Sequence, residues 1–354
     1  MAQLDGLIKE LCPNGVEYKK LSDVLTIRNG KDYKSFAEGS IPVYGSGGIM
    51  TYIDHFAYDK PSVLIPRKGS LDKLYYVDVP FWTVDTIFYT VIDTKIVEPK
   101  YIFYVLQKEH LEKLNKAGGV PSLTQAVISK VKIPVPPLPV QREIVRILDN
   151  FTELTTELTT ELTARKQQYA YYRDKLLAFG DDVPKDTLEN LCDFQYGKGN
   201  SIPTAPGEYP VYGCNGVVGT TNVFNSIDAP VIGHIGSAGI VNWGKGKHFV
   251  TYNGTICKVR PEKMISRYAY HLLCSLHLER FVKGSQPFLS YSDFAKETVS
   301  VPPLNIQQRV VSILDRFDTL CNDLTKGLPA EIEARQKQYE YYRDKLLTFK
   351  ELGA

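Results

Sequence analysis

"QYAYYRDKLLAF" at residues 168–179 and "QYEYYRDKLLTF" at residues 338–349 are nearly the same twelve-residue phrase, written twice in a chain of 354 residues. A second pair precedes them: "PPLPVQREIVRILDNF" at 136–151 matches "PPLNIQQRVVSILDRF" at 302–317. Self-similarity over so long a period indicates a repeat architecture. We predict a tandem duplication of one unit, in which a globular part is followed by a helical part.

The likeness also extends backward through the non-helical regions. "LSDVLTIRNGK" (21–31) aligns with "LENLCDFQYGK" (188–198), and "IPVYGSGGI" (41–49) with "YPVYGCNGV" (209–217). "YIFYVLQ" (101–107) pairs with "YAYHLLC" (268–274), and "GGVPSLT" (118–124) with "GSQPFLS" (284–290). Two long repeats of this kind predict internal pseudo-twofold symmetry.

The repeated phrases are predicted to be helical. No Gly or Pro interrupts residues 141–179, and Pro139 stands where a helix would begin. Thirty-nine residues at 1.5 Å each would make a rod of roughly 58 Å. Apolar residues at steps of three and four form one stripe in the first copy: Ile147, Phe151, Leu154, Leu158, Leu162, Tyr169, Tyr172 and Leu176.

The second copy has a matching stripe, formed by Ile313, Phe317, Leu320, Leu324, Ile332, Tyr339, Tyr342 and Leu346. Gly327 and Pro329 interrupt it and predict a break between two helices. Two rods that each need a partner for an apolar stripe are expected to pair as an antiparallel coiled coil. In that arrangement the phrase YYRDKLL belongs to the core and the helix seam.

Residues 152–163 of the first rod read TELT three times. Thr is a mediocre helix former, so helix propensity does not explain the run. One interpretation is an ordinary amphipathic helix with a slipped repeat. The other is a spacer whose length changes in whole units, each adding about 6 Å and slightly more than one turn.

The globular parts are rich in Tyr, Val, Ile, Gly and Pro. Short runs such as "SVLIP", "TIFYTVID", "APVIGHIG" and "GTICKV" predict strands separated by Gly-containing turns. A short helix is expected in each part, at "YIFYVLQKEHLEKL" and "RYAYHLLCSLHLERF". The predicted fold class is α+β: two pseudo-symmetric globular domains, residues 1–135 and 180–301, separated by helical segments at residues 136–179 and 302–354.

Composition limits the possible settings of the chain. No apolar run approaches the roughly 18 residues that a membrane span requires, and the N-terminus lacks an apolar signal segment, so we expect a cytoplasmic location. The six cysteines form no CxxC pair and are interpreted as reduced thiols. The net charge of +2 neither favours nor excludes a nucleic-acid partner, because local charge binds phosphates.

No catalytic or metal-binding constellation is recognisable. Amino-methyltransferase signatures of the DPPY or NPPF kind, HExxH and a Ser nucleophile elbow are all missing from the sequence. "GIVNWGKG" (239–246) has Walker A spacing, but Gly246 occupies the position of the required Ser or Thr. "VEPK" (97–100) lacks the upstream Pro-Asp of a nuclease and is interpreted as a loop. We therefore expect neither catalytic residues nor a metal site.

In their order and duplication, these phrases resemble the DNA-specificity subunits of type I restriction–modification systems, and the resemblance covers essentially the whole chain. It implies that each globular part is a target-recognition domain for one half of a bipartite site in double-stranded DNA. It implies that the helices fix the half-site spacing and dock two modification subunits, which bind S-adenosylmethionine and methylate adenine. Restriction subunits, with ATP and Mg, would add translocation and cleavage. The chain itself would hold no cofactor.

Candidate DNA-binding residues are polar and basic side chains in Gly-rich loops at matched positions of the two repeats, since Gly permits close backbone approach and basic groups neutralise phosphate. In the first domain they are Lys31, Lys34, Tyr44, Ser46, Arg67, Lys68, Ser70, Ser122 and Thr124. In the second they are Lys198, Asn200, Tyr212, Asn215, His234, Ser237, Lys245, Lys247, Gln286 and Ser290. An alternative role for many of them is to maintain turns. Positions that differ between the copies, such as Arg67 and His234, are the better candidates for specificity.

Four residues flanking the helix starts are candidates for contact with the modification subunits: Gln141, Arg142, Gln307 and Gln308. The N-terminal segment "LIKELCPNGVEYKKL" is expected to pack near the end of the C-terminal helix. Two alternatives stay open. The chain could serve a methyltransferase that lacks a restriction subunit, or it could be a coiled-coil adaptor that does not bind DNA.

Overall fold

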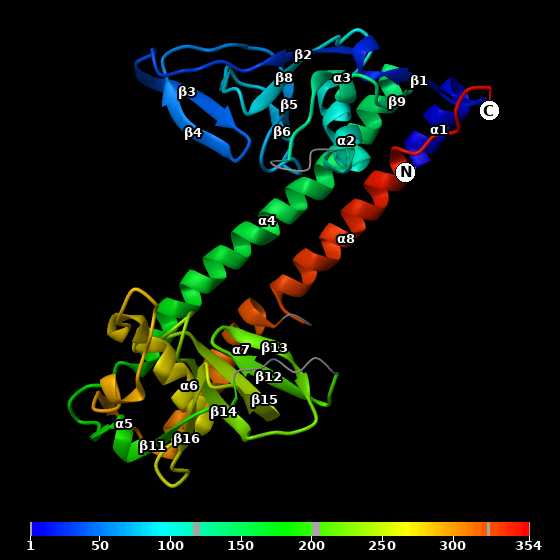
Figure 1. Ribbon diagram of the computed structural model, residues 1–354. Coiled ribbons are helices and arrows are strands. Elements are labelled where there is room, and N and C mark those ends of the chain that lie inside the picture. Colours follow the sequence, from blue (N-terminus) through cyan, green and yellow to red (C-terminus); the bar gives the residue numbers. More distant parts are fainter. Residues whose placement is uncertain (1, 116–120, 200–205, 324–325, 354) are drawn as a thin grey trace. The chain divides into compact units, whose positions relative to one another are not determined.

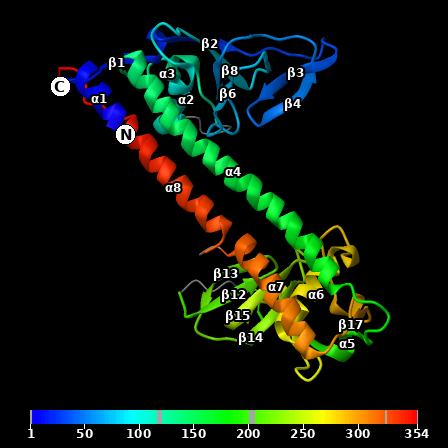
Figure 2. The same cartoon turned by 180° about the vertical axis from the view of Figure 1, so that it is seen from behind.

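The computed structural model describes residues 2–115, 121–199, 206–323 and 326–353. They divide into two compact units: unit 1 comprises residues 1–157 and 332–354, and unit 2 comprises residues 158–331. Each unit contains β-sheets, a short helix packed on them and parts of the long helices (Figures 1 and 2). The predicted α+β class is confirmed. No helix among the described residues has the length and apolar character needed to span a membrane.

Unit 1 holds three small sheets, with strand orders β2-β8-β5-β6, β4-β3-β7 and β1-β9. Strand pairing is antiparallel except between β3 and β7, which are parallel. The strands are β1 (Glu17–Lys20), β2 (Leu25–Asn29), β3 (Glu38–Gly45), β4 (Gly48–Ile53), β5 (Ser62–Pro66), β6 (Tyr75–Val77), β7 (Trp82–Thr83), β8 (Ile87–Ile92) and β9 (Lys132–Val135).

Unit 2 combines the corresponding strands into one six-stranded sheet, β11-β16-β14-β15-β12-β13, beside a two-stranded β10-β17 sheet. The difference arises because β15 is continuous, whereas Pro80, which cannot donate to a ladder, lies between β6 and β7. The strands are β10 (Lys185–Thr187), β11 (Cys192–Tyr196), β12 (Tyr209–Gly213), β13 (Gly216–Thr221), β14 (Ser226–Gly233), β15 (Val241–Val250), β16 (Gly254–Val259) and β17 (Thr298–Ser300).

The predicted helices and the break between them are confirmed. The helices are α1 (Ala2–Leu11), α2 (Pro99–Glu109), α3 (Gln125–Ile128), α4 (Leu138–Leu177), α5 (Leu188–Leu191), α6 (Ser266–Ser275), α7 (Leu304–Asn322) and α8 (Leu328–Leu346). The described residues also form the short 3-10 turns η1 (Leu21–Asp23), η2 (Leu111–Leu114), η3 (Leu278–Phe281) and η4 (Tyr291–Asp293). After α2 and α6, the matched residues His110 and His277 adopt the left-handed conformation, each with φ of 49°, and end the predicted short helices.

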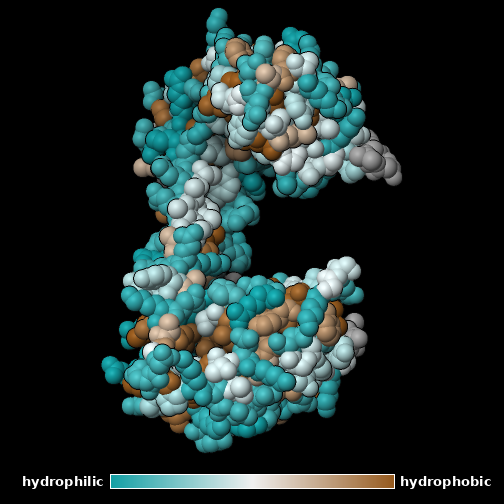
Figure 3. All heavy atoms as spheres, turned by 90° about the vertical axis from the view of Figure 1, so that its left-hand side faces the viewer, coloured by the Kyte–Doolittle hydropathy of each residue, from teal (hydrophilic) through white to brown (hydrophobic). Residues whose placement is uncertain are grey.

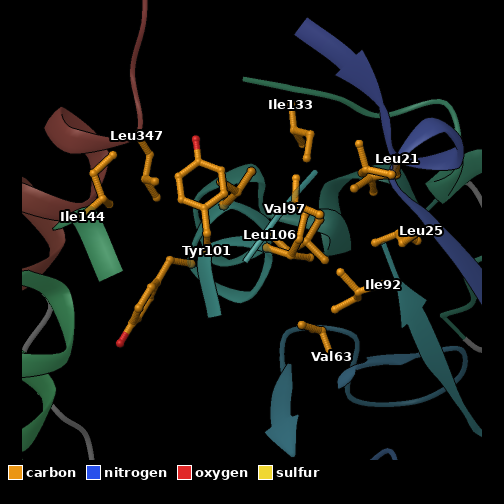
Figure 4. Close-up of a cluster of buried hydrophobic side chains, with 14 of the residues drawn as sticks. Leu21, Leu25, Val63, Ile92, Val97, Tyr101, Leu106, Ile133, Ile144 and Leu347 are labelled. Carbon is orange, nitrogen blue, oxygen red and sulfur yellow. The ribbon is translucent and has the colours of Figure 1, made fainter. Parts of the chain in front are cut away.

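The long helices pair in antiparallel fashion inside each unit. In unit 1, Phe151 of α4 stacks on Tyr342 of α8 with ring centroids 5.3 Å apart, and Ile144 and Leu347 belong to the same core (Figure 4). In unit 2, Tyr172 in the second half of α4 stacks on Phe317 of α7 at 5.7 Å. These contacts confirm helix pairing within each unit.

Part of the predicted stripe is wrong, and one of its members, Leu324, lies outside the described residues. Ile313 and Leu320 are exposed, because the face of α7 that packs is formed by Val310, Leu314, Phe317 and Cys321. Likewise, Tyr171 and Tyr341 of the repeated YYRDKLL phrase are about 60% exposed, so only part of that phrase lies in the seam. Steps of three and four residues describe a broad arc of a helix, and the partner selects which side of the arc is buried.

The core of unit 1 joins its sheets to its helices. Tyr101 and Leu106 of α2 lie between strand residues such as Val63 and two residues from the helical segments, Ile144 of α4 and Leu347 directly after α8 (Figure 4). Both ends of the chain also belong to this unit. The Val16 N–H donates to Lys350 O at 2.9 Å, confirming that the N-terminal segment packs beside the C-terminal segment.

A buried glutamine fastens each globular part to its long helix. Near the start of α4, Gln141 Oε1 accepts from the Glu98 N–H at the N-terminus of α2, at 2.9 Å, and Nε2 donates to Ile96 O and Pro136 O at 3.0 and 2.7 Å. Gln307 in α7 repeats the pattern with Ile265 N, Lys263 O and Pro302 O, each at 2.9 Å. Both side chains, which the sequence nominated for partner contact, are therefore buried and occupied within their own units.

A cluster of polar side chains strengthens the same attachment of each globular part to its long helix, which we call the joint. In unit 1, Asp149 of α4 accepts from Lys100 Nζ at 2.8 Å and from Tyr104 Oη at 2.5 Å. In unit 2, the matched Asp315 accepts from Arg267 Nε and interacts with His271 Nε2, both at 2.7 Å. Arg267 also pairs with Asp318.

His271 is fully buried in this cluster, and Tyr169 Oη lies 2.9 Å from its Nδ1. Burial lowers the pKa of His271, although the hydrogen bond with Asp315 opposes that effect and nearby Arg267 adds to it. A neutral ring that accepts from Tyr169 and donates to Asp315 satisfies both ring nitrogens.

Replacing the buried glutamine should destabilise the chain far more than replacing its exposed neighbour. We expect Gln307→Ala to lower the free energy of unfolding by roughly 2–4 kcal/mol, because it leaves buried backbone groups unsatisfied. Gln308→Ala, one residue along the same helix and exposed, should change it by less than about 0.5 kcal/mol. Urea unfolding of both variants measures this, and equal losses would contradict the role assigned to Gln307.

The buried histidine should also make stability depend on pH. Its pKa is lower in the folded than in the unfolded chain, so the stability that it contributes is present above about pH 6.5 and is lost as pH falls toward the folded-state pKa. Urea unfolding should show a smaller difference between pH 7.5 and pH 5 for His271→Gln than for the unmodified chain. His277→Gln, at an exposed histidine, is the control and should keep the full difference.

Candidate nucleic-acid interface

Residues 83–86, which are the last residue of β7 and its connection to β8, hold several loops of unit 1 together. Thr83 O accepts from the Lys31 N–H at 2.8 Å. The Val84 N–H donates to Tyr44 O at 3.0 Å. Two loops that are distant in sequence, one after β2 and one at the end of β3, are thereby fixed to one connector.

The loop after β5 joins the same network. The Arg67 N–H donates to Thr86 O at 2.9 Å, and Thr86 Oγ1 accepts from the Ser46 N–H at 3.3 Å. Arg67 O in turn accepts from the Leu123 N–H at 2.9 Å. We call this set loop cluster 1; it comprises residues 29–31, 44–46, 67–69, 83–86 and 121–125.

Unit 2 repeats the four backbone hydrogen bonds of this network, and we call it loop cluster 2; it comprises residues 196–198, 212–214, 234–236, 250–253 and 287–291. The Lys198 N–H donates to Val250 O at 3.0 Å, and the Thr251 N–H to Tyr212 O at 3.0 Å. The His234 N–H donates to Asn253 O at 2.8 Å, and the Leu289 N–H to His234 O at 2.9 Å. The internal repeat predicted from the sequence is thus confirmed at the level of single hydrogen bonds.

One glycine in each cluster is required by the close approach of two backbones. A Cβ at Gly30 would lie 2.0 Å from Val84 O, and one at Gly197 would lie 2.1 Å from Thr251 O. No side chain fits at such distances. This steric limit explains the repeated glycine of the Gly-Lys pair, at residues 30–31 and 197–198.

The predicted residues of the first domain lie in or beside loop cluster 1. Lys31, Lys34, Lys68, Ser70 and Thr124 are exposed, and Tyr44, Ser46, Arg67 and Ser122 are half-buried. Hydrogen bonds or bridges of the cluster join Lys31, Tyr44, Ser46, Arg67, Lys68 and Ser122. Lys34 lies in a separate turn, where its N–H donates to Asp32 Oδ1, and Thr124 caps α3.

The predicted residues of the second domain are more dispersed. Lys198, Asn215, Lys245, Lys247 and Gln286 are exposed, Ser237 and Ser290 are half-buried, and Tyr212 and His234 are buried. Asn200 lies outside the described residues. Lys245 and Lys247 belong to β15, where Lys247 Nζ lies over the Phe224 ring at 4.9 Å. Ser290 caps η4, whereas His234 Nδ1 donates to Leu289 O at 2.6 Å and supports the loop from inside.

The electrostatic character of the clusters is mixed. Lys68 in cluster 1 lies 3.7 Å from the Asp85 carboxylate, and both are well exposed. Burial raises the pKa of both Tyr44 and Tyr212, so these phenols stay protonated, and Tyr212 donates to Trp243 O at 3.1 Å. Figure 3 shows polar side chains over most of the visible surface, with smaller apolar areas on both units.

The two motifs set aside in the sequence have structural roles. Gly246 lies within β15 at φ of 59°, and its N–H donates to Asp228 Oδ1 at 2.7 Å, so the Gly-rich stretch 239–246 runs into a strand and not into a helix. The interpretation of "VEPK" as a loop is wrong for its second half, because Pro99 and Lys100 begin α2 and Glu98 is the N-cap. Within the described residues, no group of three or more His, Cys, Asp or Glu side chains could hold a metal ion.

The sequence did not lead to the two segments that organise the loop clusters, residues 83–86 and 250–253, which we call the connectors. Thr86 and Asn253 accept the bonds that position Arg67 and His234, yet neither was among the candidates. It also missed Asn29 and Gln125, whose amides are hydrogen-bonded at 3.1 Å. Extending the repeat alignment across residues 82–86 and 249–253 would have identified the connectors.

The two remaining partner candidates are exposed. Arg142 Nε lies 2.5 Å from the Glu98 carboxylate beside the glutamine joint, and Gln308 faces away from the core of unit 2. They stay available for an intermolecular contact, in contrast to the buried Gln141 and Gln307.

Comparison with known proteins agrees with this architecture. The type I restriction modification DNA specificity domain matches the chain twice, at residues 13–165 and 182–334. The EcoR124I/EcoR124II specificity subunit of Escherichia coli is 32% identical over 98% of this chain and 96% of its own. A Haemophilus influenzae protein named as a type I restriction enzyme specificity subunit is 30% identical over 94% and 96%.

A solved structure shares the fold. The S subunit of a type I restriction-modification system from M. genitalium superposes with a TM-score of 0.65 at 18% identity, covering 94% of this chain and 96% of its own. Both halves of the chain match one domain family, and two relatives match along nearly the whole length. The chain therefore belongs to the family of type I restriction–modification DNA-specificity subunits.

Proposed function

We propose that this chain reads a bipartite DNA site, each half of which is bound by one target-recognition domain, domain 1 (residues 1–135) and domain 2 (residues 180–301). The observation that carries the proposal is the duplication of one loop scaffold with different side chains on it. Two copies of a loop scaffold with matched backbone bonds and different side chains are suited to reading two different short sequences. Base edges in the major groove supply the distinguishing donors, acceptors and methyl groups.

The helical segments at residues 136–179 and 302–354 set the spacing between the half-sites. The buried glutamine and aspartate joints support this role, because they fix each globular part on its own helix. A rigid joint converts helix length into a fixed distance between reading surfaces. The same helices dock two modification subunits, with Arg142 and Gln308 among the exposed contacts.

The chain acts without catalysing a reaction itself. Modification subunits carrying S-adenosylmethionine methylate adenine in each half-site, and restriction subunits using ATP and Mg translocate and cleave DNA. A system with only the methyltransferase is an alternative for the same chain. Exchange of one domain distinguishes a chain that recognises DNA from a purely structural adaptor.

Exchanging one domain should change one half-site. Replacing residues 180–301 by the second domain of another family member should alter one half of the methylated motif and leave the other half and the gap unchanged. Methylome sequencing in the host, with and without the gene, measures this. An adaptor that does not bind DNA would leave methylation independent of the exchange.

Shortening the TELT run should change the gap alone. Removal of one unit shortens a helix by about 6 Å, which corresponds to one or two base pairs at about 3.4 Å each. We expect both half-sites to be retained and the gap to change by that amount. An altered half-site with an unchanged gap, read by the same methylome sequencing, would contradict the spacer role.

A further inference from the structure

The two loop clusters share their backbone but differ in the kind of side chain at five matched positions. In cluster 1 these positions hold polar or charged groups: Asn29, Arg67, Asp85, Ser122 and Gln125. In cluster 2 every one of them holds a ring: Tyr196, His234, Tyr252, Phe288 and Tyr291. At all five positions, a polar or charged side chain of cluster 1 thus corresponds to an aromatic ring in cluster 2.

The equivalence of these positions rests on the structure as well as on the alignment. Lys68 and Ser122 form a β-bridge in cluster 1, and Ile235 and Phe288 form the same bridge in cluster 2. Asn29 ends β2, as Tyr196 ends β11. Two features of the scaffold are the same in both copies, the Gly-Lys pair and the leucine at 123 or 289. The five positions therefore carry different side chains on a matched backbone.

In cluster 1 the amides of Asn29 and Gln125 form a pair. Gln125 Nε2 donates to Asn29 Oδ1 at 3.1 Å. This bond uses one donor and one acceptor, so the pair keeps the Gln125 carbonyl oxygen and the Asn29 amino group for another partner. An adjacent acceptor and donor match the N6 and N7 groups of adenine in the major groove.

Arg67 is held by its backbone and not by an ion pair. Its N–H and C=O are bonded to Thr86 and Leu123, and its guanidinium lies 5.8 Å from the centroid of the Phe88 ring. Among the described residues, no carboxylate lies within salt-bridge distance of that guanidinium. A half-buried Arg with a fixed backbone and an unpaired fork is suited to bidentate binding of guanine O6 and N7.

In cluster 2 the rings support one another. Tyr196 lies over His234 at 4.2 Å and near Tyr291 at 5.1 Å, and His234 lies 4.7 Å from Phe288. His234 is buried, whereas Tyr252 and Phe288 are each about 40% exposed. The inner rings therefore position two outer rings, which offer apolar surface where cluster 1 offers hydrogen bonds.

We propose that these five matched positions supply the base-reading side chains of each domain and the side chains that position them: domain 1 reads guanine and adenine by hydrogen bonds, and domain 2 reads thymine methyl groups by apolar contact. The inference rests on the proposed function and adds the residues and the chemistry of recognition. Arg67, Asn29 and Gln125 contact bases in domain 1. Tyr252 and Phe288 do so in domain 2, where His234 is a positioning residue.

The test uses the full chain assembled with its methyltransferase partner in the host, with methylome sequencing as the readout. Arg67→Ala should relax the requirement for guanine at one position of the first half-site by roughly tenfold or more. Phe288→Ser, which installs the cluster 1 residue, should relax a thymine position in the second half-site. In each variant the other half-site and the gap should stay unchanged.

Arg28→Ala is the matched control. Arg28 is exposed and precedes Asn29 in β2, so its side chain points to the opposite face of the strand. Its removal takes away the same charge as Arg67→Ala and should leave the motif unaltered. A motif change in Arg28→Ala equal to that in Arg67→Ala would overturn the inference.

Conservative variants address folding. Arg67→Lys keeps the charge but loses the fork, so it should relax the same single position; Phe288→Tyr should retain the thymine preference. Relaxation of a whole half-site in either variant, an unchanged guanine position in Arg67→Lys, or loss of methylation in both variants would overturn the inference.

Failure of the proposed function itself gives a different result. If deletion of the gene left all bipartite methylation in place, the chain would not supply specificity at all. If methylation required the gene but the variants read the same motif, only the inference about these five positions would fail.

Discussion

The rest of the structure depends on the hydrogen bonds of one buried glutamine side chain, which occurs once in each repeat. Gln141 and Gln307 each bond to the first turn of a short helix and to the segment leading into a long helix. Loss of these buried hydrogen bonds would leave backbone groups without water or protein partners, which is far more costly than loss of a surface contact. The orientation of each globular part on its helix is therefore specified locally, inside its own unit. Any function that relies on distance between the two parts inherits its precision from these two joints and from the stiffness of the helices.

Much of the fold could be predicted because the sequence contains an internal duplication. The repeated segments predicted the helices, the break near Gly327 and the matched strands. The predictions that failed concern tertiary packing. Ile313 satisfies the helical spacing, but the packing partner buries Val310 and Leu314. Gln141 was assigned to the surface because it is polar, and only the structure shows that three buried backbone groups need it.

The candidate site was predictable at the level of loops and not of side chains. Gly-rich loops signal close backbone approach, and the structure gives the reason at Gly30, where a Cβ would collide with Val84 O. Which side chain faces outward depends on neighbours far away in sequence. Arg67 and His234 occupy the same backbone position, yet one is half-buried beside a phenylalanine and the other is enclosed by rings. The backbone hydrogen bonds that hold the loops are the same in both units, whereas the side chains on the loops differ. The side chains, and with them recognition, can therefore change while the fold does not.

A similar separation between the packed fold and a variable feature explains the position of the TELT run in α4. The boundary between the two units falls inside this run, between Glu157 and Leu158. Two of its threonine hydroxyls donate within the helix, Thr155 to Phe151 O and Thr163 to Thr159 O. Both joints lie outside the run, and a change of four residues keeps the apolar side chains near one face of the helix. Length can therefore vary at this point with the least disturbance to packing, whereas the same change near Gln141 would displace a buried amide from all three of its partners.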